Sequence, residues 1–338
     1  MRLYCGIDLH STNSYIVVLD DHDHVIFKVR VSNDLGLILS RLAPYKAHLQ
    51  GIAVESTFNW YWLVDGLMEA GYKVHLVNTG AVQQYKGLKH TDDDHDARWL
   101  AHLLRLGILP EGYIYPAETR GIRDLLRKRS QLVRHRTAHV LSVQNLMSRN
   151  TGRMIKGNTI KEWTADDVDR QITDPHLAMA VKSNVMVMQA LNRQIEELEA
   201  TVQKQARWRP EFKPLLSVQG VGPVLGLTIM LETGDIKRFR KVGQYASYCR
   251  CVESKRLTND KKKGEGNRKN GNKYLAWAFV EAAHFATQKE GLIKRFFQRK
   301  AAKKNKIVAI KAVAHKLARA CYCILRDQVP FDVNKAFA

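Results

Sequence analysis

Short apolar runs separated by polar turns dominate the first third of the chain. Some runs are rich in Val, Ile and Tyr and have the length of strands, whereas others repeat apolar residues at the three- and four-residue spacing of a helix. The pattern predicts strands over residues 3–8, 14–20, 25–31, 51–55 and 73–77. It predicts helices over residues 35–42, 59–70 and 92–106.

The order of these elements indicates a fold class. Three strands form an antiparallel meander, and then helix, strand, helix, strand and helix follow. This is the order of an RNase H-like α/β domain, in which helices flank a mixed sheet. We therefore expect an α/β domain of this type over residues 1–110.

Strand signals fade after Pro110, and long helical patterns replace them. Residues 122–150 and residues 178–205 form two such patterns, the second with heptad-like spacing. A pair of this kind is typical of an antiparallel hairpin or of a dimerisation arm. A third block is again helical, with a Gly- and Lys-rich loop in its middle. We expect a coiled-coil-like helical linker over residues 111–210 and a mostly helical C-terminal domain over residues 211–338.

Charge is divided unevenly along the chain. The 338 residues carry 54 Lys and Arg against 33 Asp and Glu, a net charge of +21. Residues 1–110 hold 10 basic and 12 acidic residues, which leaves 44 basic and 21 acidic residues and a net charge of +23 for the remainder. A remainder this cationic attracts phosphate backbones, so we expect nucleic acid as a partner. Charge alone does not separate an enzyme from a nucleic-acid-binding protein without catalysis.

No apolar run is predicted to cross a membrane. The run over residues 307–325 is interrupted by Lys311, His315, Lys316 and Arg319. The N-terminus leads straight into a strand-like pattern rather than a signal peptide. Five cysteines, an odd number, indicate free thiols in a reducing compartment. We expect a cytoplasmic, nucleoid-associated bacterial protein with no membrane partner.

Four carboxylates are predicted to meet at one edge of the sheet. Asp8 ends the first strand, Glu55 ends the fourth, and Asp93 and Asp96 open a helix. Taken singly they are explained as turn residues and helix caps. Taken together, four carboxylates at one edge repel one another unless a cation lies between them. Two Mg²⁺ ions (or Mn²⁺) gripping a scissile phosphate are the usual arrangement in nucleases.

A second set of candidates lies in the basic block. Gly220 and Gly222 precede an apolar helix and resemble a helix-hairpin-helix turn, where glycines let backbone N–H groups approach a DNA phosphate. An ordinary helix connection is the alternative. Ser254 has cationic neighbours but no obvious general base, so the sequence around it favours a plain surface serine over a nucleophile. The candidate nucleic-acid-binding residues are Gly220, Gly222, Lys255, Arg256, Lys261, Lys262, Lys263, Arg268, Lys269 and Lys273.

Together these motifs resemble the DEDD-type transposases of the insertion sequence 110 family, to which the Piv DNA invertases are related. The resemblance covers nearly the whole chain. Gly6-Ile7-Asp8 is similar to the first-strand Asp of the family, Val54-Glu55-Ser56-Thr57 to its Glu motif, and Asp93-Asp94-His95-Asp96-Ala97 to its paired aspartates. Gly220–Pro223 and the stretch from Glu253 to Leu275 are similar to its C-terminal transposase domain.

The chain departs from the family pattern at two places. His90-Thr91-Asp92 precedes Asp93 where a Lys or Asn is frequent in relatives. Thr258-Asn259-Asp260 stands where a final Gly is expected, and Asp adopts a left-handed backbone less readily than Gly. Neither departure touches a candidate catalytic residue.

The resemblance implies a RuvC-like N-terminal domain, a helical linker and a C-terminal domain with a nucleophilic serine, here Ser254. It also implies a non-coding bridge RNA that selects donor and target DNA. We therefore predict an RNA-guided transposase that acts as a homo-dimer or tetramer. One rival is a RuvC-like nuclease or protein-guided DNA invertase in which metal-activated water cuts. The other is a non-catalytic basic RNA- or DNA-binding protein.

Overall fold

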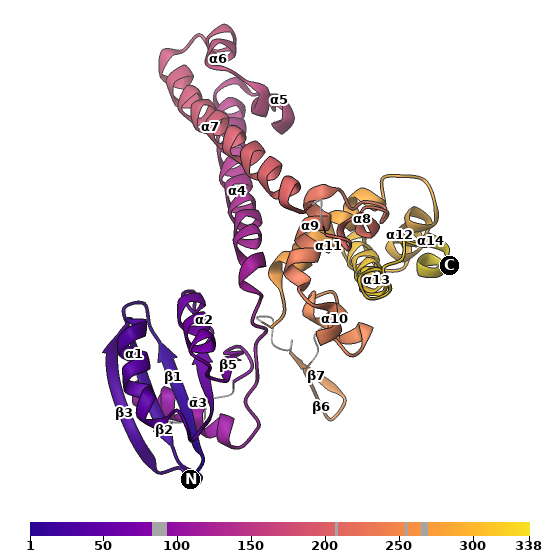
Figure 1. Ribbon diagram of the computed structural model, residues 1–338. Coiled ribbons are helices and arrows are strands. Elements are labelled where there is room, and N and C mark those ends of the chain that lie inside the picture. The colour runs from indigo at the N-terminus through magenta and orange to yellow at the C-terminus, as the bar shows by residue number, and fades with distance from the viewer. Residues whose placement is uncertain (83–92, 207–208, 254–255, 265–269) are drawn as a thin grey trace. The chain divides into compact units, whose positions relative to one another are not determined.

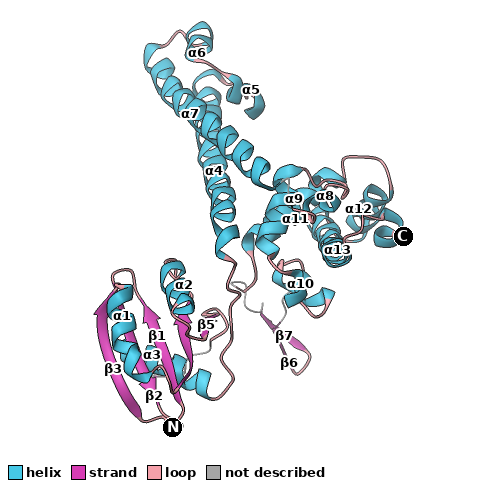
Figure 2. Ribbon diagram, in the orientation of Figure 1, coloured by secondary structure: helices cyan, strands magenta, loops and turns pink. Residues whose placement is uncertain are grey.

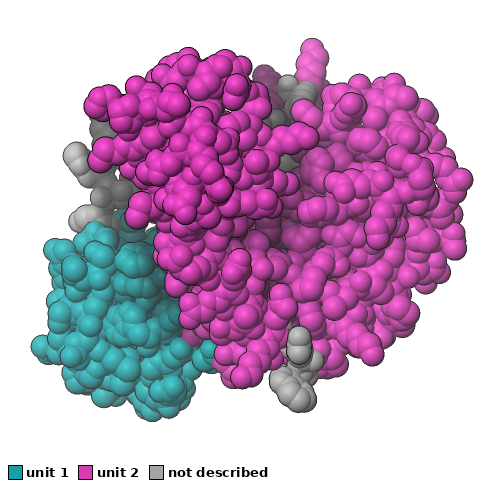
Figure 3. Space-filling model, turned by 90° about the horizontal axis from the view of Figure 1, so that it is seen from above, with its two compact units in different colours: residues 1–117 teal, residues 118–338 magenta. Residues whose placement is uncertain are grey.

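The computed structural model of the chain describes residues 1–82, 93–206, 209–253, 256–264 and 270–338. These form two compact units, Met1–Ala117 and Glu118–Ala338, which Figure 3 colours separately. The first unit contains an α/β sheet, and the second is mostly helical (Figure 2). Among the described residues, no helix is long and apolar enough to span a membrane.

A five-stranded mixed sheet forms the centre of the first unit (Figure 1). Its strands lie in the order β3-β2-β1-β4-β5; β1 pairs antiparallel with β2 and β2 with β3, whereas β4 pairs parallel with both β1 and β5. The strands are β1 (Leu3–Leu9), β2 (Asn13–Leu19), β3 (Val25–Ser32), β4 (Leu49–Glu55) and β5 (Val74–Val77). The sequence predicted each of these strands to within two residues at either end.

Helices pack on both faces of this sheet. Strand side chains alternate between the faces, so Cys5, Ile7 and Leu9 pack in the core beneath α1 (Leu35–Leu42) and α2 (Tyr61–Glu69). The opposite face receives α3 (Asp93–Arg105), whose Ala97 and Ala101 pack against β2. A short 3₁₀ helix over Ala43–Tyr45 follows α1. The sheet is therefore covered on both sides, as expected for an α/β domain.

An antiparallel pair of long helices begins the second unit. Helix α4 (Ala117–Thr151) and α7 (Pro175–Ala206) are joined through α5 (Gly157–Glu162) and α6 (Ala165–Gln171). Near one end the pair is bridged by Arg129 and Glu199, and near the other by His139 and Asn184. A separate apolar core, with Trp163 buried in it, fills the end where the short helices lie. The two long helices therefore form an antiparallel hairpin, one of the two possibilities that the sequence offered.

The remaining helices surround a second core. The element bounds are α8 (Phe212–Leu215), α9 (Pro223–Thr233), a 3₁₀ helix (Ile236–Arg238), α10 (Val242–Tyr248), α11 (Lys273–Ala286), α12 (Leu292–Lys303), α13 (Lys306–Asp327) and α14 (Val333–Phe337). Helix α9 is buried from Leu225 to Thr233, and α11 and α13 pack closely around the same core. This block is mostly helical, as the sequence predicted.

A short β-hairpin interrupts the helices where the sequence indicated only a Gly- and Lys-rich loop. Strand β6 (Arg256–Thr258) pairs antiparallel with β7 (Lys261–Gly264). The turn residues Asn259 and Asp260 both have left-handed backbones, with φ of 48° and 57°. Two left-handed residues in succession are the signature of the two-residue turn that matches strand twist. The turn signal was therefore present in Asn-Asp, but the flanking strands are too short and too basic to show a period-two pattern.

Candidate active site

Asp8 is placed on the buried face of the sheet that α3 covers. Its side chain lies on the face of the sheet to which a side chain at position 6 would point, because residues two apart on a strand share a face. A Cβ at Gly6 would lie 2.0 Å from the Ala97 carbonyl oxygen, so only glycine lets α3 approach this closely. Asp8 is only 4% exposed at the end of β1. A carboxylate this buried requires a partner or a proton.

Glu55 lies next to Asp8 because of strand register. Ile7 pairs with Val54 in the parallel β1–β4 ladder, so the following residues, Asp8 and Glu55, are neighbours at the sheet edge. Burial, a hydrogen bond with Asp8, and the charges of Asp8 and Asp96 raise the pKa of Glu55 to about 8. This raised pKa favours the protonated form of Glu55 near neutral pH when no cation is bound.

The start of α3 brings the two remaining candidate carboxylates to this edge. Asp93 Oδ1 lies 3.3 Å from His10 Nε2, and the charge of Asp96 acts on Glu55. Asp94, between them, differs because its Oδ2 pairs with Lys28 Nζ at 2.8 Å. The structure thus brings together Asp8, Glu55, Asp93 and Asp96, and it gives their neighbour Asp94 a cationic partner on β3.

His10 is a member of the cluster that the sequence reasoning missed. Its Nε2 lies 3.0 Å from Asp8 Oδ2 and 3.3 Å from Asp93 Oδ1, so the ring sits between the two carboxylates. The side-chain amides of Asn33 and Asn59 each donate to the His10 carbonyl at 3.0 Å, which holds the turn after β1 in place. Its spacing, two residues after Asp8, was the available signal, because that spacing selects the same face of a strand.

The donor set suits a divalent cation. One ligand atom each from Asp8, His10 and Asp93 lies within 4.8 Å of the others, which is a separation that one ion can bridge. The raised pKa of Glu55 means that an added positive charge would displace a proton from the cluster and relieve its repulsion. Carboxylate oxygens are the ligands that Mg²⁺ and Mn²⁺ prefer, and one imidazole is compatible with either metal.

A second buried carboxylate, Glu232 on α9, was also missed by the sequence reasoning. Arg127 donates to its two oxygens at 2.6 and 2.8 Å, Arg123 donates at 3.2 Å, and Asn272 donates at 2.7 Å. Burial alone would raise the pKa of Glu232, but Arg127, Arg123 and Asn272 outweigh burial and lower it. Asn272 also caps α11 by accepting from Tyr274 N and Leu275 N. The cluster therefore joins α4, α9 and α11.

The candidate nucleic-acid residues occupy varied surroundings. Gly220, with φ of +90°, lies where a Cβ would be 2.2 Å from the Ala282 carbonyl oxygen, so its glycine is required by packing against α11. Gly222 is exposed at the N-cap of α9, and Lys261, Lys263 and Lys273 are exposed. Outside the described residues lie Ser254, Lys255, Arg268 and Lys269, and also the side chains of Arg256 and Lys262.

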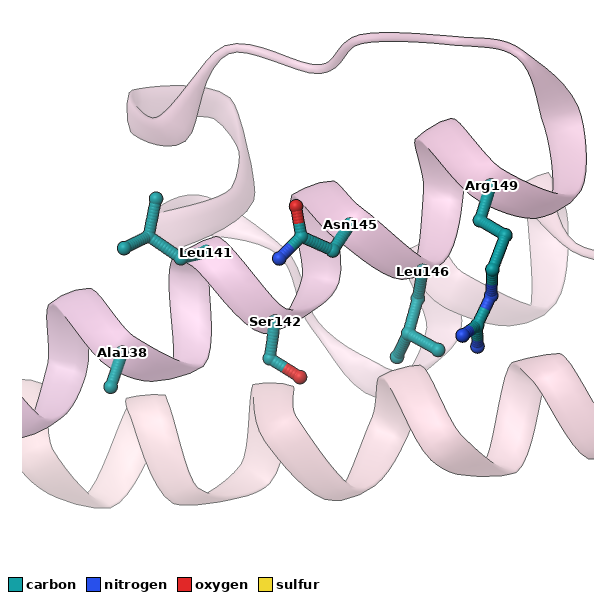
Figure 4. A pocket seen from close by; sticks show the side chains of 6 residues that line it. All are labelled: Ala138, Leu141, Ser142, Asn145, Leu146 and Arg149. Atoms are coloured by element: carbon teal, nitrogen blue, oxygen red, sulfur yellow. The ribbon is translucent and has the colours of Figure 1, made fainter.

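A shallow hollow on α4 offers no catalytic chemistry. It is lined by Ala138, Leu141, Ser142, Asn145, Leu146 and Arg149, all from one helix (Figure 4). Arg149 is its single charged residue, and the lining contains no carboxylate, histidine or cysteine. The carboxylate cluster of the first unit therefore remains the candidate active site.

Comparison with known proteins relates both units to transposases. A family model described as a transposase, of the DEDD-type IS110 group, matches residues 5–150, and one described as the transposase IS116/IS110/IS902 family matches residues 213–298. A probable family 20 transposase of Pseudomonas aeruginosa is 24% identical over 336 residues, which cover 95% of this chain and 96% of that protein. The transposase of insertion sequence element IS1111A from Coxiella burnetii is 21% identical over 334 residues, 96% of this chain and 87% of that protein.

A mixed α/β unit with a carboxylate cluster, a basic helical unit and these matches together define an enzyme that acts on DNA. The chain belongs to the IS110 family of transposases.

Proposed function

We propose that the chain is an RNA-guided DNA recombinase whose first unit is a RuvC-like, RNase H-like catalytic domain. The observation that carries the proposal is the meeting of Asp8, Glu55, Asp93 and Asp96 at one sheet edge, with the pKa of Glu55 raised to about 8. The sheet has the order β3-β2-β1-β4-β5, and β2 runs antiparallel to the other four strands. This arrangement agrees with an RNase H-like domain. Cytoplasmic, nucleoid-associated action belongs to the same proposal.

Asp8, Glu55, Asp93 and Asp96 would hold Mg²⁺ or Mn²⁺, and His10 would contact the same cluster. When bound, such ions polarise the scissile phosphate and stabilise both the attacking and the leaving oxygens. The chain itself contributes the pre-arranged carboxylates, of which Asp8 is buried and the other three are half-buried. Glu55 must release its proton for the cluster to take up a cation, so it couples metal affinity to pH.

Ser254 would be the nucleophile, a role that rests on the family resemblance. Its Oγ forms a bond to phosphorus while the bond from phosphorus to the 3′ oxygen breaks, and the serine proton passes to the departing 3′ oxygen. The product is a 5′-phosphoserine link and a free 3′ hydroxyl. Attack by another strand's 3′ hydroxyl then reverses the exchange, so the energy of the phosphodiester bond is preserved for rejoining. Lys255, Arg256 and Lys261 would stabilise the charge that develops on the phosphate.

The partners proposed are donor and target DNA and a non-coding bridge RNA, handled by a homo-dimer or tetramer. The net charge of +23 on the chain beyond residue 110 supports binding of polyanions. Because the basic residues outnumber the acidic ones more than two to one there, structured RNA and duplex DNA would both be attracted.

Trapping the covalent intermediate tests this function. Cleavage of a nicked suicide substrate, with Mg²⁺ and with or without the RNA encoded beside the gene, should yield protein bound to DNA only when RNA is present. Ser254→Ala should lose the adduct, and Glu55→Gln should lose cleavage altogether. Cleavage by Ser254→Ala at the normal rate, without an adduct, would contradict the serine mechanism and identify a metal-activated-water nuclease. Salt-sensitive binding without any Mg²⁺-dependent product would identify a non-catalytic binding protein.

A further inference from the structure

Much of the chain's net positive charge lies in α12 and α13, outside the candidate nucleic-acid-binding residues named above. Between Gly291 and Arg326 there are eleven Lys and Arg residues and no Asp or Glu. These eleven charges correspond to more than half of the net charge of +21. A helical face that is merely solvated usually alternates acidic and basic residues, which support one another at three- and four-residue spacing. This segment lacks the acidic half of that pattern.

The helix that carries these charges is held in place because the opposite face of α12 is packed. Ile293 and Phe296 are buried in the C-terminal core, and the Phe296 ring meets that of Phe337 edge-on at 5.5 Å. Lys316 Nζ donates to the Ala336 carbonyl at 2.6 Å, which ties α13 to α14 behind the same aromatic pair. The cations of α12 therefore project from a rigid helix rather than from a flexible tail.

The exposed side of α12 continues into the first turn of α13 as one basic surface. Arg295, Arg299 and Lys303 lie four residues apart in succession, so they share one helix face, and all three are exposed. We name this the α12 basic surface; its members are Arg295, Arg299, Lys300, Lys303, Lys304 and Lys306.

The α12 basic surface has no counter-charge within the described part of the chain. The ion pairs of the 291–326 segment stand at its two ends, Lys294 with Glu290 and Arg326 with Asp327. Like charges at four-residue spacing on a helix repel one another and destabilise the helix. Arg295–Arg299 and Arg299–Lys303 are two such pairs within α12. This repulsion destabilises the free protein, and the negative charge of a bound polyanion would reduce it.

We propose that the α12 basic surface binds the sugar-phosphate backbone of nucleic acid without regard to sequence; the proposal rests on the proposed function, in which nucleic acids are substrate and guide. From Arg295 to Lys303 the helix rises about 12 Å, over which one strand of duplex presents three or four phosphates. Arginine engages phosphate oxygens in pairs and lysine as a point charge, so neither reads bases from the backbone.

The test compares two triple variants with the same loss of charge in the full chain. Arg295→Gln, Arg299→Gln and Lys303→Gln together alter the α12 basic surface. Arg153→Gln, Lys156→Gln and Lys204→Gln together are the matched control, because these three are also exposed and lie on the α4–α7 hairpin or its connection. The dissociation constant is measured against salt concentration for a short random duplex DNA and for a single-stranded RNA of equal length.

Log affinity falls as log salt rises, and the surface triple should make this fall less steep. The slope should shrink in magnitude by about 0.9 for each lost duplex contact and by about 0.7 for each lost single-strand contact. The two probes show whether DNA, RNA or both occupy the surface, and the control triple should leave the slope near that of the wild-type chain. Equal losses in the two triples would reduce the effect to net charge and overturn the proposal. So would an unchanged slope in the surface triple, or a wild-type chain that binds neither probe. Salt-sensitive binding with no strand-transfer product would instead remove the proposed function and leave the surface intact.

Discussion

Glu55 is half-buried and Glu232 is buried, and their surroundings shift their pKa values in opposite directions. Glu55 faces Asp8 and Asp96 in the first unit, and its pKa rises to about 8. Glu232 faces Arg123 and Arg127 in the second unit, and its pKa falls below its ordinary value. Burial acts against the charged form at both sites, so the difference comes from the neighbours.

The contrast distinguishes the Glu55 site, whose charges are not balanced within the protein, from the Glu232 site, whose charge is balanced by arginines. Glu232 has its counter-charges within the protein, with both oxygens and the buried Asn272 amide satisfied. Glu55 has like charges beside it and gains most from a cation or a proton. A buried carboxylate alone is therefore a poor guide to function; the sign of the charges around it distinguishes a structural ion pair from a candidate metal site.

The largest effect is expected on catalysis. Glu55→Gln should lower the strand-transfer rate about a thousandfold, equivalent to about 4 kcal/mol, because a ligand of the proposed metal site is lost. Asp94→Asn is the matched control, since Asp94 lies on the same turn of α3 as Asp93 and Asp96 but is paired with Lys28. Single-turnover rates at saturating Mg²⁺ measure both variants. A rate for Glu55→Gln equal to that of Asp94→Asn would remove Glu55 from the site.

The same chemical change at Glu232 should act on stability instead. Glu232→Gln removes the carboxylate charge that pairs with the buried Arg123 and the half-buried Arg127, which should cost about 3–5 kcal/mol. Glu55→Gln should be neutral or stabilising in metal-free protein, because it removes one carboxylate from a crowded cluster. Urea unfolding followed by helical circular dichroism measures the first effect. Equal stability of the wild-type chain and Glu232→Gln would contradict the view that the ion cluster joins α4, α9 and α11.

The two carboxylates should also give opposite pH dependences of unfolding. The pKa of Glu55 is raised, so its contribution to stability is full below about 4.5 and is lost as pH rises through about 8. After discounting for solvent screening, about 1–2 kcal/mol is expected in the presence of a chelator. The pKa of Glu232 is lowered, so its contribution is present above its ordinary pKa and is lost as pH falls below it. The measurement is the unfolding free energy of wild type and of Glu55→Gln between about pH 5 and about pH 9, the range where Glu55 titrates. The wild-type chain should lose stability relative to Glu55→Gln as pH rises through about 8. Parallel curves would contradict the raised pKa of Glu55.

The smallest effect is expected when the surroundings of Glu232 are made more like those of Glu55. Asn272→Asp keeps the oxygen that caps α11 but places a second carboxylate 2.7 Å from Glu232, where an amide now donates. The pKa of Glu232 should rise, and stability at neutral pH should fall by about 1 kcal/mol, because two arginines still compensate part of the added charge. Nuclear magnetic resonance titration of the labelled carboxyls would detect the shift. Asn272→Ala, which removes both cap and donor without adding charge, separates the charge effect from loss of the cap.

Much of the first unit was accessible from the sequence because its signals are local. Strand alternation and helical spacing predicted β1 to β5 and the start of α3, and the predicted helix over residues 35–42 coincides with α1. Asp8, Glu55, Asp93 and Asp96 are recognisable in the sequence as residues at element ends, and the register of β1 with β4 makes the first two neighbours. The α4–α7 pair was likewise visible in its spacing, and the uneven charge is a property of the sequence itself.

Only the tertiary structure decided which side chains meet. His10 joins the cluster because two asparagines from distant turns hold its carbonyl, and Asp94 leaves it because Lys28 on β3 reaches it. Glu232 meets Arg127 across 105 residues of sequence and Asn272 across 40. Periodicity reports the face on which a residue lies, over a few neighbouring residues. The charge opposite that residue is set by the packing of elements far apart in the chain, so the sign of each pKa shift, and with it the difference between Glu55 and Glu232, emerges only on folding.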